Sequence, residues 1–345
     1  MRLCDRLVEV AANSKNAAQL RDELYGALGN LCPTQDIDAT YNLAAAVKDT
    51  PVRYMLTPEV SAAAWQMAAF SSQSVIKGIE IIRMRVPELW IEWPDRSRRE
   101  ILEQMKALPP VGPSEVIPER VGVYLRATDD TGRRGIARWA WSTSDVPAAI
   151  SVQTSLLEMH FDLDDPNYRY VDDIDDRYTI GLSAKGEEEH LDPLLGYQAY
   201  VLSPEIAADF AASGIDPLSP LGAGMIRQGA KDLGGEGSHL FALLLMLIAR
   251  NAVDQKPSDL ARLNAKREKR GKSPLLDHVE LSMSLSRVQA RRMASQQLGG
   301  TATARRFHTV SGHIRFRGDQ AYWWRPYSRG DIRLGVVKRT VTVRR

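Results

Sequence analysis

The chain is poor in the residues that build metal and disulfide frameworks. Only two of its 345 residues are cysteines, Cys4 and Cys32, and neither belongs to a Cys-x-x-Cys pair. This excludes a structural zinc ribbon and a disulfide scaffold. The sequence also lacks a Gly-Lys-Ser/Thr phosphate loop and a G-x-G-x-x-G segment after a strand. We therefore predict no cofactor.

Long apolar runs are also missing. The longest, from Leu240 to Ala249, would span roughly 15 Å as a helix, whereas a bilayer core is about 30 Å thick. We expect this run to form a buried helix and expect no membrane contact. The first residues contain an acid and no apolar segment of signal-peptide length, which predicts a cytoplasmic protein.

What the chain does have is an uneven distribution of charge. Residues 262–345 contain 20 Lys/Arg and 5 Asp/Glu, a net charge of about +15, and the whole chain carries +2, so residues 1–261 carry about −13. A strongly basic region attracts polyanions. Nucleic acid is therefore the expected partner, with DNA and RNA both open.

The order of patterns predicts an α+β protein with a helical N-terminal region, a central antiparallel sheet and a basic β-rich C-terminal domain. Residues 1–85 are alanine-rich and interrupted by prolines, which favours helices throughout. Residues 86–261 contain short aromatic and β-branched runs typical of strands. Residues 262–345 form the third region.

Two runs of the middle region flank the turn-forming sequence Asp129-Asp130-Thr131-Gly132, which predicts an antiparallel hairpin. Side chains alternate along a strand, so Trp139 and Trp141 should share one face, whereas Trp90 and Trp93 should lie on opposite faces. We expect all four tryptophans to pack in the core.

Two stretches resemble binding motifs without matching them. Eleven carboxylates lie between Glu158 and Glu189, but neither the glycine of a calcium loop nor an interleaved His or Cys accompanies them. A solvated acidic loop is favoured, and by charge it could rest against the basic region and mimic nucleic acid. Glycines around residues 222–237 precede the apolar helix, for which Ser238 is the expected N-cap.

The basic region supplies the candidate contact residues. Its arginines and lysines suit phosphate contacts, and its aromatic side chains suit base stacking. Adjacent residues of a strand point to opposite faces, so at most one of Trp323 and Trp324 is free, and we predict Trp324 to be the buried one. The predicted nucleic-acid-binding residues are Lys266, Arg267, Lys269, Arg270, Lys272, Arg315, Arg317, Tyr322, Trp323, Arg325 and Arg329.

Two histidines of this region are the alternative catalytic candidates. His308 and His313 are five residues apart, so on one continuous strand they face opposite sides, and only a kink at Gly312 could bring them together. No Cys or carboxylate lies at a suitable spacing, so no metal site is predicted. Further along, Gly318-Asp319-Gln320 predicts the turn of a small antiparallel hairpin.

The C-terminal pattern resembles a set of uncharacterised proteins carried by phages, prophages and plasmids. It comprises His308, Val310, Gly312, His313, Arg317, Trp324, Arg325, Pro326, Arg329 and Gly330, and has Ser311 where those proteins often carry an arginine. The segments at 263–278 and 90–94 are similar as well. This resemblance implies a mobile-element origin and transfers no activity.

These observations favour a phage- or prophage-encoded nucleic-acid-binding or regulatory accessory protein over an enzyme. One alternative is an endoribonuclease-like hydrolase that uses His308 or His313 as general acid or base. The other is a protein-interaction module, such as an inhibitor of host defence or a virion component, which would bind a host or phage protein.

Overall fold

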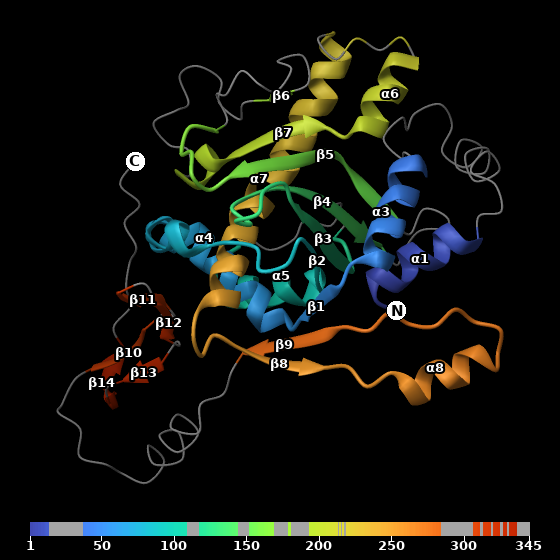
Figure 1. Cartoon of the computed structure of the whole chain (residues 1–345). Helices are drawn as coiled ribbons and strands as arrows, with labels where there is room; N and C mark the ends of the chain where they lie inside the picture. The colour runs from blue at the N-terminus through green and yellow to red at the C-terminus, as the bar shows by residue number, and fades with distance from the viewer. Residues whose placement is uncertain are drawn as a thin grey trace.

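In the computed structural model, three layers form the body of the protein, with one mixed sheet between two groups of helices (Figure 1). The structure describes residues 1–13, 37–108, 117–143, 152–168, 179–180, 193–212, 214, 216, 219–283, 306–310, 313–318, 320–324, 327–329 and 331–336. The α+β class is confirmed. No helix of these ranges is long and apolar enough to cross a membrane.

The large sheet has nine strands in the order β6-β7-β5-β4-β3-β2-β1-β9-β8. They are β1 (Val52–Leu56), β2 (Glu88–Trp93), β3 (Arg120–Ala127), β4 (Arg134–Ser142), β5 (Val152–Asp162), β6 (Thr179–Ile180), β7 (Gln198–Leu202), β8 (Val253–Pro257) and β9 (Val279–Met283). All neighbours pair antiparallel except β1, which is parallel to both β2 and β9. The sheet thus combines strands from all three sequence regions.

Helices cover both faces of this sheet. One face carries α4 (Pro58–Gly78), α5 (Asp95–Gln104), α6 (Pro204–Ala212) and α7 (Pro220–Ile248), with the short turns η2 (Ile79–Ile81) and η6 (Pro193–Tyr197). The other carries α1 (Leu3–Asn13) and α3 (Ile37–Asp49). Trp93 and Trp139 pack in the first core and Trp90 in the second, as the alternation predicts, and Trp141 packs partly buried against the first.

Two sequence-based expectations about secondary structure are wrong. Residues 1–85 are not helical throughout, because Val52–Leu56 form β1 in the centre of the sheet. The glycines around 222–237 lie inside one helix, α7, whose N-cap is Ser219 and not Ser238. Ser219 Oγ accepts from the Gly222 amide at 3.1 Å. Gly237 is needed in this helix because a Cβ there would collide with Gln198 and Tyr200 of β7.

The acidic stretch starts inside the sheet. Glu158 and Asp162 lie buried on β5, and Arg138 and Arg134 of β4 pair with them at 2.6 and 2.8 Å. These two acids are therefore strand residues with arginine partners and not part of a solvated loop. The later aspartates at 172–176 lie outside the described residues.

The remaining described elements lie between or after the last two strands of the large sheet in the chain. Helix α8 (Ala261–Glu268) connects β8 to β9, and β11 (His313–Arg317) pairs with β12 (Gln320–Trp324) as the predicted antiparallel hairpin. A three-stranded sheet contains β10 (Arg306–Val310), β13 (Tyr327–Arg329) and β14 (Asp331–Val336). Gly318, at the turn of the hairpin, has φ +55°, a conformation that glycine adopts without strain.

Candidate nucleic-acid interface

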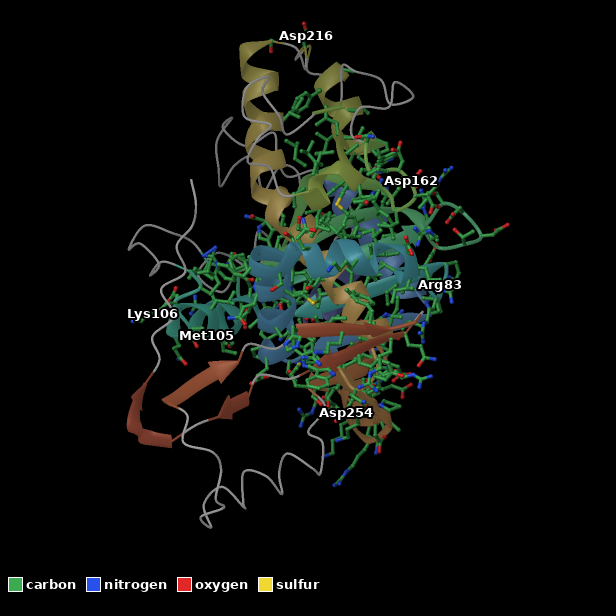
Figure 2. The ribbon with its side chains drawn as sticks, turned by 90° about the vertical axis from the view of Figure 1, so that its left-hand side faces the viewer. Arg83, Met105, Lys106, Asp162, Asp216 and Asp254 are labelled. Carbon is green, nitrogen blue, oxygen red and sulfur yellow. The ribbon has the colours of Figure 1, made fainter. Side chains whose placement is uncertain are left out.

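The β11–β12 hairpin is fixed to the body through one apolar face. Ile314, Ala321 and Trp323 are buried, and Phe316 packs against the same core. The hairpin lies on the ends of α4 and α7, where a Cβ on Gly78 would come within 3.2 Å of the Phe316 ring. The side of the molecule that carries the hairpin faces the viewer in Figure 2.

Backbone hydrogen bonds join Arg250, two residues after the end of α7, to the hairpin. The Arg250 amide donates to the Ala321 carbonyl at 2.9 Å, and the Trp323 amide donates to the Arg250 carbonyl at 3.2 Å. Arg250 thus pairs with β12 beside Tyr322. Because these bonds and the apolar face act together, the outer side chains are presented from a fixed backbone.

The outer face alternates cations and rings. The guanidinium carbon of Arg315 lies 3.9 Å from the Trp324 ring centroid, and those of Arg317 and Arg250 each lie 5.8 Å from the Tyr322 ring centroid. All three distances are within the range of cation–π attraction. We call Arg250, His313, Arg315, Arg317, Tyr322 and Trp324 the cation–aromatic face.

His313 completes this face at its open end. Its ring centroid is 6.2 Å from that of Trp324, and its Nε2 accepts a hydrogen bond from Arg315 Nε at 3.3 Å. Across the hairpin His313 stands opposite Trp324, and Arg315 stands opposite Tyr322. One imidazole, two rings and three guanidinium groups are therefore contiguous.

The positive charge of this face is not neutralised by the described residues. Within them, no carboxylate forms an ion pair with Arg250, Arg315 or Arg317, whereas arginines of β4 pair with acids of β5. A surface with one sign of charge, one exposed ring and one half-buried ring is suited to a ligand that carries both phosphate and base.

The structure corrects the prediction for the two adjacent tryptophans. Trp323 is 6% exposed and belongs to the core, while Trp324 is 36% exposed and stacks with Arg315. Alternation shows that the two point to opposite faces, but it does not determine which face meets the body. That is decided by α4 and α7, against which the hairpin packs.

The other predicted residues are not all in one place. Lys266, Arg267, Lys269, Arg270 and Lys272 lie on and just after α8, at the opposite side of the molecule from the hairpin (Figure 1). Arg325 lies outside the described residues, and Arg329 is the last residue of β13. Arg250 belongs to the cation–aromatic face, but its position after an apolar helix gave no sequence signal for it.

The two candidate histidines belong to different sheets. His308 is on β10, which pairs with β13 and β14, whereas His313 is on β11, which pairs with β12. They therefore lie on two different described strands, and Gly312 between them is outside the described residues.

A buried polar cluster places a serine, a histidine and a carboxylate in the order of a hydrolytic triad, but it lies inside the core. His239 Nδ1 is 3.0 Å from Glu236 Oε2, and His239 Nε2 is 3.3 Å from Ser61 Oγ. Arg98 pairs with the same carboxylate through two nitrogens, at 2.8 and 3.2 Å. Because Ser61 and His239 are both 0% exposed, no substrate reaches this serine. The cluster instead ties α4, α5 and α7 together.

The ionisation of this cluster is set by burial and by Arg98. Burial lowers the pKa of His239, and the nearby Glu236 opposes this shift only in part. Burial also disfavours the Glu236 carboxylate, but Arg98 and His239 outweigh it and hold the pKa of Glu236 below its ordinary value. In the folded protein His239 is therefore neutral and lies beside the ion pair of Arg98 and Glu236.

Comparisons with known proteins do not identify the chain: no family model, curated protein or solved structure matches it. Among the residues that the structure describes, no group of three or more His, Cys, Asp or Glu side chains could hold a metal ion.

Proposed function

We propose that the protein binds single-stranded nucleic acid through its cation–aromatic face. The observation that carries the proposal is the stacking of Arg315, Arg317 and Arg250 on Trp324 and Tyr322, on one exposed side of a fixed hairpin. Bases stack on such rings for about 1–3 kcal/mol each, and arginines pair with phosphates.

The spacing of the rings favours an unpaired strand. Tyr322 and Trp324 are two residues apart on β12, which places them about 6.6 Å apart along the strand. Bases in a duplex are stacked about 3.4 Å apart and expose only their edges. A single strand can turn its bases outward so that each ring receives one, and DNA and RNA can both do so.

The biological setting is part of the same proposal. The resemblance to phage, prophage and plasmid proteins supports an accessory or regulatory role in a mobile element, in the cytoplasm, with a host or phage protein as a further partner. The charged and exposed character of the cation–aromatic face supports a binding role over catalysis.

The test is fluorescence anisotropy with labelled 20-nucleotide DNA and RNA strands over a range of salt concentrations. Trp324→Ala should weaken binding about 5- to 150-fold, which corresponds to about 1–3 kcal/mol of lost stacking. Arg315→Gln should reduce the slope of log K against log salt by about 0.7.

Matched controls are available elsewhere on the surface. Phe70 is an exposed aromatic residue of α4, and Arg83 is an exposed arginine beyond it. Phe70→Ala and Arg83→Gln should leave affinity and salt slope unchanged. If the wild-type protein binds neither strand at low salt, or if Phe70→Ala weakens binding as much as Trp324→Ala, the proposal is wrong.

A further inference from the structure

A second basic surface lies on an arm at the edge of the large sheet. The arm comprises residues 258–278 between β8 and β9, and it includes α8 (Figure 1). Helix α8 has no buried residue, and its one large apolar side chain, Leu263, is exposed. The helix is therefore not held in place by a hydrophobic face, unlike α4 or α7.

The charge of the arm is concentrated on its outer part. Six basic residues and one acid, Glu268, lie between 261 and 273; the six are Arg262, Lys266, Arg267, Lys269, Arg270 and Lys272. Arg262, Lys266 and Arg270 are four residues apart in succession, so they follow one side of α8 and its C-terminal end. Like charges at this spacing repel one another and destabilise an isolated helix.

Specific polar contacts hold the arm in spite of this repulsion. The Asn264 side chain both donates to the Leu275 carbonyl at 3.0 Å and accepts from the Leu275 amide at 2.8 Å. Arg267 Nε donates to the Ser273 carbonyl at 2.8 Å. The helix and the returning segment are thus joined to each other.

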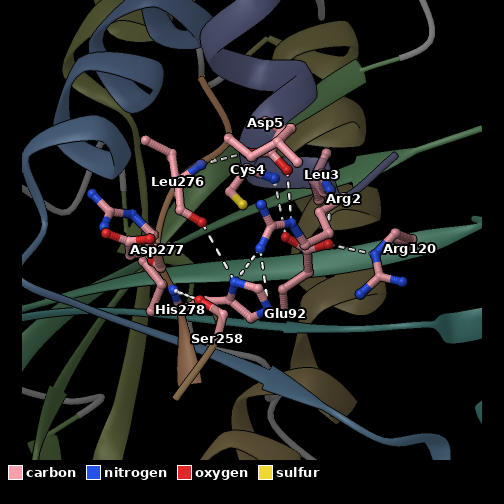
Figure 3. A network of polar contacts seen from close by, with 12 residues as sticks. Arg2, Leu3, Cys4, Asp5, Glu92, Arg120, Ser258, Leu276, Asp277 and His278 are labelled. Carbon is pink, nitrogen blue, oxygen red and sulfur yellow. Dashed lines mark hydrogen bonds and ion pairs between the residues drawn. The ribbon is translucent and has the colours of Figure 1, made fainter. Parts of the chain in front are cut away.

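The returning segment is in turn joined to the N-terminal helix α1 (Figure 3). The Leu276 amide donates to Asp5 Oδ1 at 2.9 Å, and Arg2 contacts the His278 ring. Helix α1 is itself anchored by the fully buried Glu92, which accepts the Leu3 and Cys4 amides at 2.7 and 3.0 Å. The arm consequently has a fixed direction, and little ordering remains to be done when a ligand binds.

We propose that this arm binds the phosphate backbone of double-stranded nucleic acid. None of the six basic side chains forms an ion pair with a described residue, so their charge is available to a polyanion. An α-helix such as α8 is about 10–12 Å in diameter with its side chains, and the major groove of B-DNA, about 12 Å wide, admits it.

Two other ligands fit the arm less well. Residues 258–278 contain no Phe, Tyr or Trp, so the arm offers no ring for the bases of a single strand. A protein partner would be expected to meet apolar or aromatic anchors, and Leu263 is the only large apolar side chain of α8. A duplex requires neither, because its backbone is recognised by charge.

The test uses the full-length protein and a labelled 20-base-pair DNA duplex. Lys266→Gln combined with Arg270→Gln should reduce the salt slope of duplex binding by about 1.8, since each lost phosphate contact accounts for about 0.9. The control is Lys48→Gln combined with Lys77→Gln, which removes the same charge from exposed positions on α3 and α4. It should leave the slope unchanged. Far-UV circular dichroism should show the same fold for both.

The outcomes separate this proposal from the one for the hairpin. If the arm variant binds duplex with the wild-type slope, or the control lowers the slope equally, the arm does not bind duplex, whatever happens with single strands. If poly-glutamate competes as well as unlabelled duplex, the ligand is an acidic protein surface and the proposal is also wrong. Trp324→Ala should weaken single-strand binding and leave duplex binding intact.

Discussion

The sharpest prediction concerns the truncation of two adjacent tryptophans, Trp323, which is buried, and Trp324, which is exposed. Trp323 is 6% exposed, and a tryptophan buries about 150–250 Å², which at about 25 cal/mol per Å² amounts to about 4–6 kcal/mol. Its Nε1 has no hydrogen-bond partner among the described residues, so truncation removes packing and no hydrogen bond. We expect Trp323→Ala to cost about 3–5 kcal/mol.

Much of this loss should appear as undocking of the hairpin. Apart from its apolar face, the hairpin is joined to α7 by the two backbone hydrogen bonds of Arg250. Once the Trp323 ring is gone, the amide protons of Arg250 and Trp323 should exchange with solvent at least 100-fold faster, which corresponds to about 3 kcal/mol of lost local stability. Hydrogen exchange followed by mass spectrometry measures this directly.

Trp324→Ala is the matched comparison. This ring is 36% exposed and stacks with Arg315, so its removal should cost about 0.5–1 kcal/mol of cation–π attraction and leave the exchange of Arg250 nearly unchanged. Single-strand binding should fall instead. The reasoning is refuted if Trp324→Ala speeds exchange as much as Trp323→Ala does, or if Trp323→Ala leaves exchange unaffected.

Three further predictions follow from the buried cluster and the histidines. Arg98→Ala should cost about 3–5 kcal/mol, measured by urea unfolding, because it leaves the largely buried Glu236 carboxylate without its cation and the buried Asp95 carboxylate with Arg99 alone, at 3.5 Å. Because the pKa of His239 is lowered in the folded protein, this histidine binds a proton more readily in the unfolded chain, so the free energy of unfolding should fall as the pH drops below about 6.5. The urea midpoint of the wild-type protein should therefore decrease from about pH 7.5 to 5.5, and His239→Gln should flatten that decrease. If the hydrolase alternative is correct, labelled RNA or DNA incubated with the pure protein is cleaved and His313→Ala abolishes cleavage without unfolding; intact strands with and without divalent metal would contradict it.

Local patterns in the sequence were enough to predict several elements. The turn residues at Asp129 lie between β3 and β4, which pair antiparallel as expected. The apolar run from Leu240 forms the buried end of α7, as expected. These features depend on residues close in the chain, where turn chemistry and side-chain alternation act directly.

Elements that depend on distant partners were not predictable in the same way. The run at Val52–Leu56 is short and follows a helix, so its composition does not reveal that it becomes a central strand between β2 and β9. The glycines at 222–237 were expected to precede the helix and not to lie inside it, because glycine weakens a helix. In the structure Gly237 permits close contact with β7, a requirement set by residues almost 40 positions away.

The candidate site shows the same division. Its arginines, its rings and the turn at Gly318 were readable from sequence. The sequence did not predict which of Trp323 and Trp324 is buried, because a strand with alternating side chains can pack against the body with either of its two faces. Arg250 was missed because its place beside Tyr322 comes from backbone pairing after α7 and not from a motif.

The two proposed surfaces are built on opposite ends of one strand. Strand β8 begins just after Arg250, which belongs to the cation–aromatic face, and ends at Pro257, next to the arm. Its five residues span about 17 Å, and its pairing with β9 makes that separation rigid. A ligand that contacts both surfaces must therefore extend along this edge. A duplex on the arm that continues as a single strand toward the hairpin meets that requirement, since of these two surfaces the hairpin carries the rings and the arm offers charge alone.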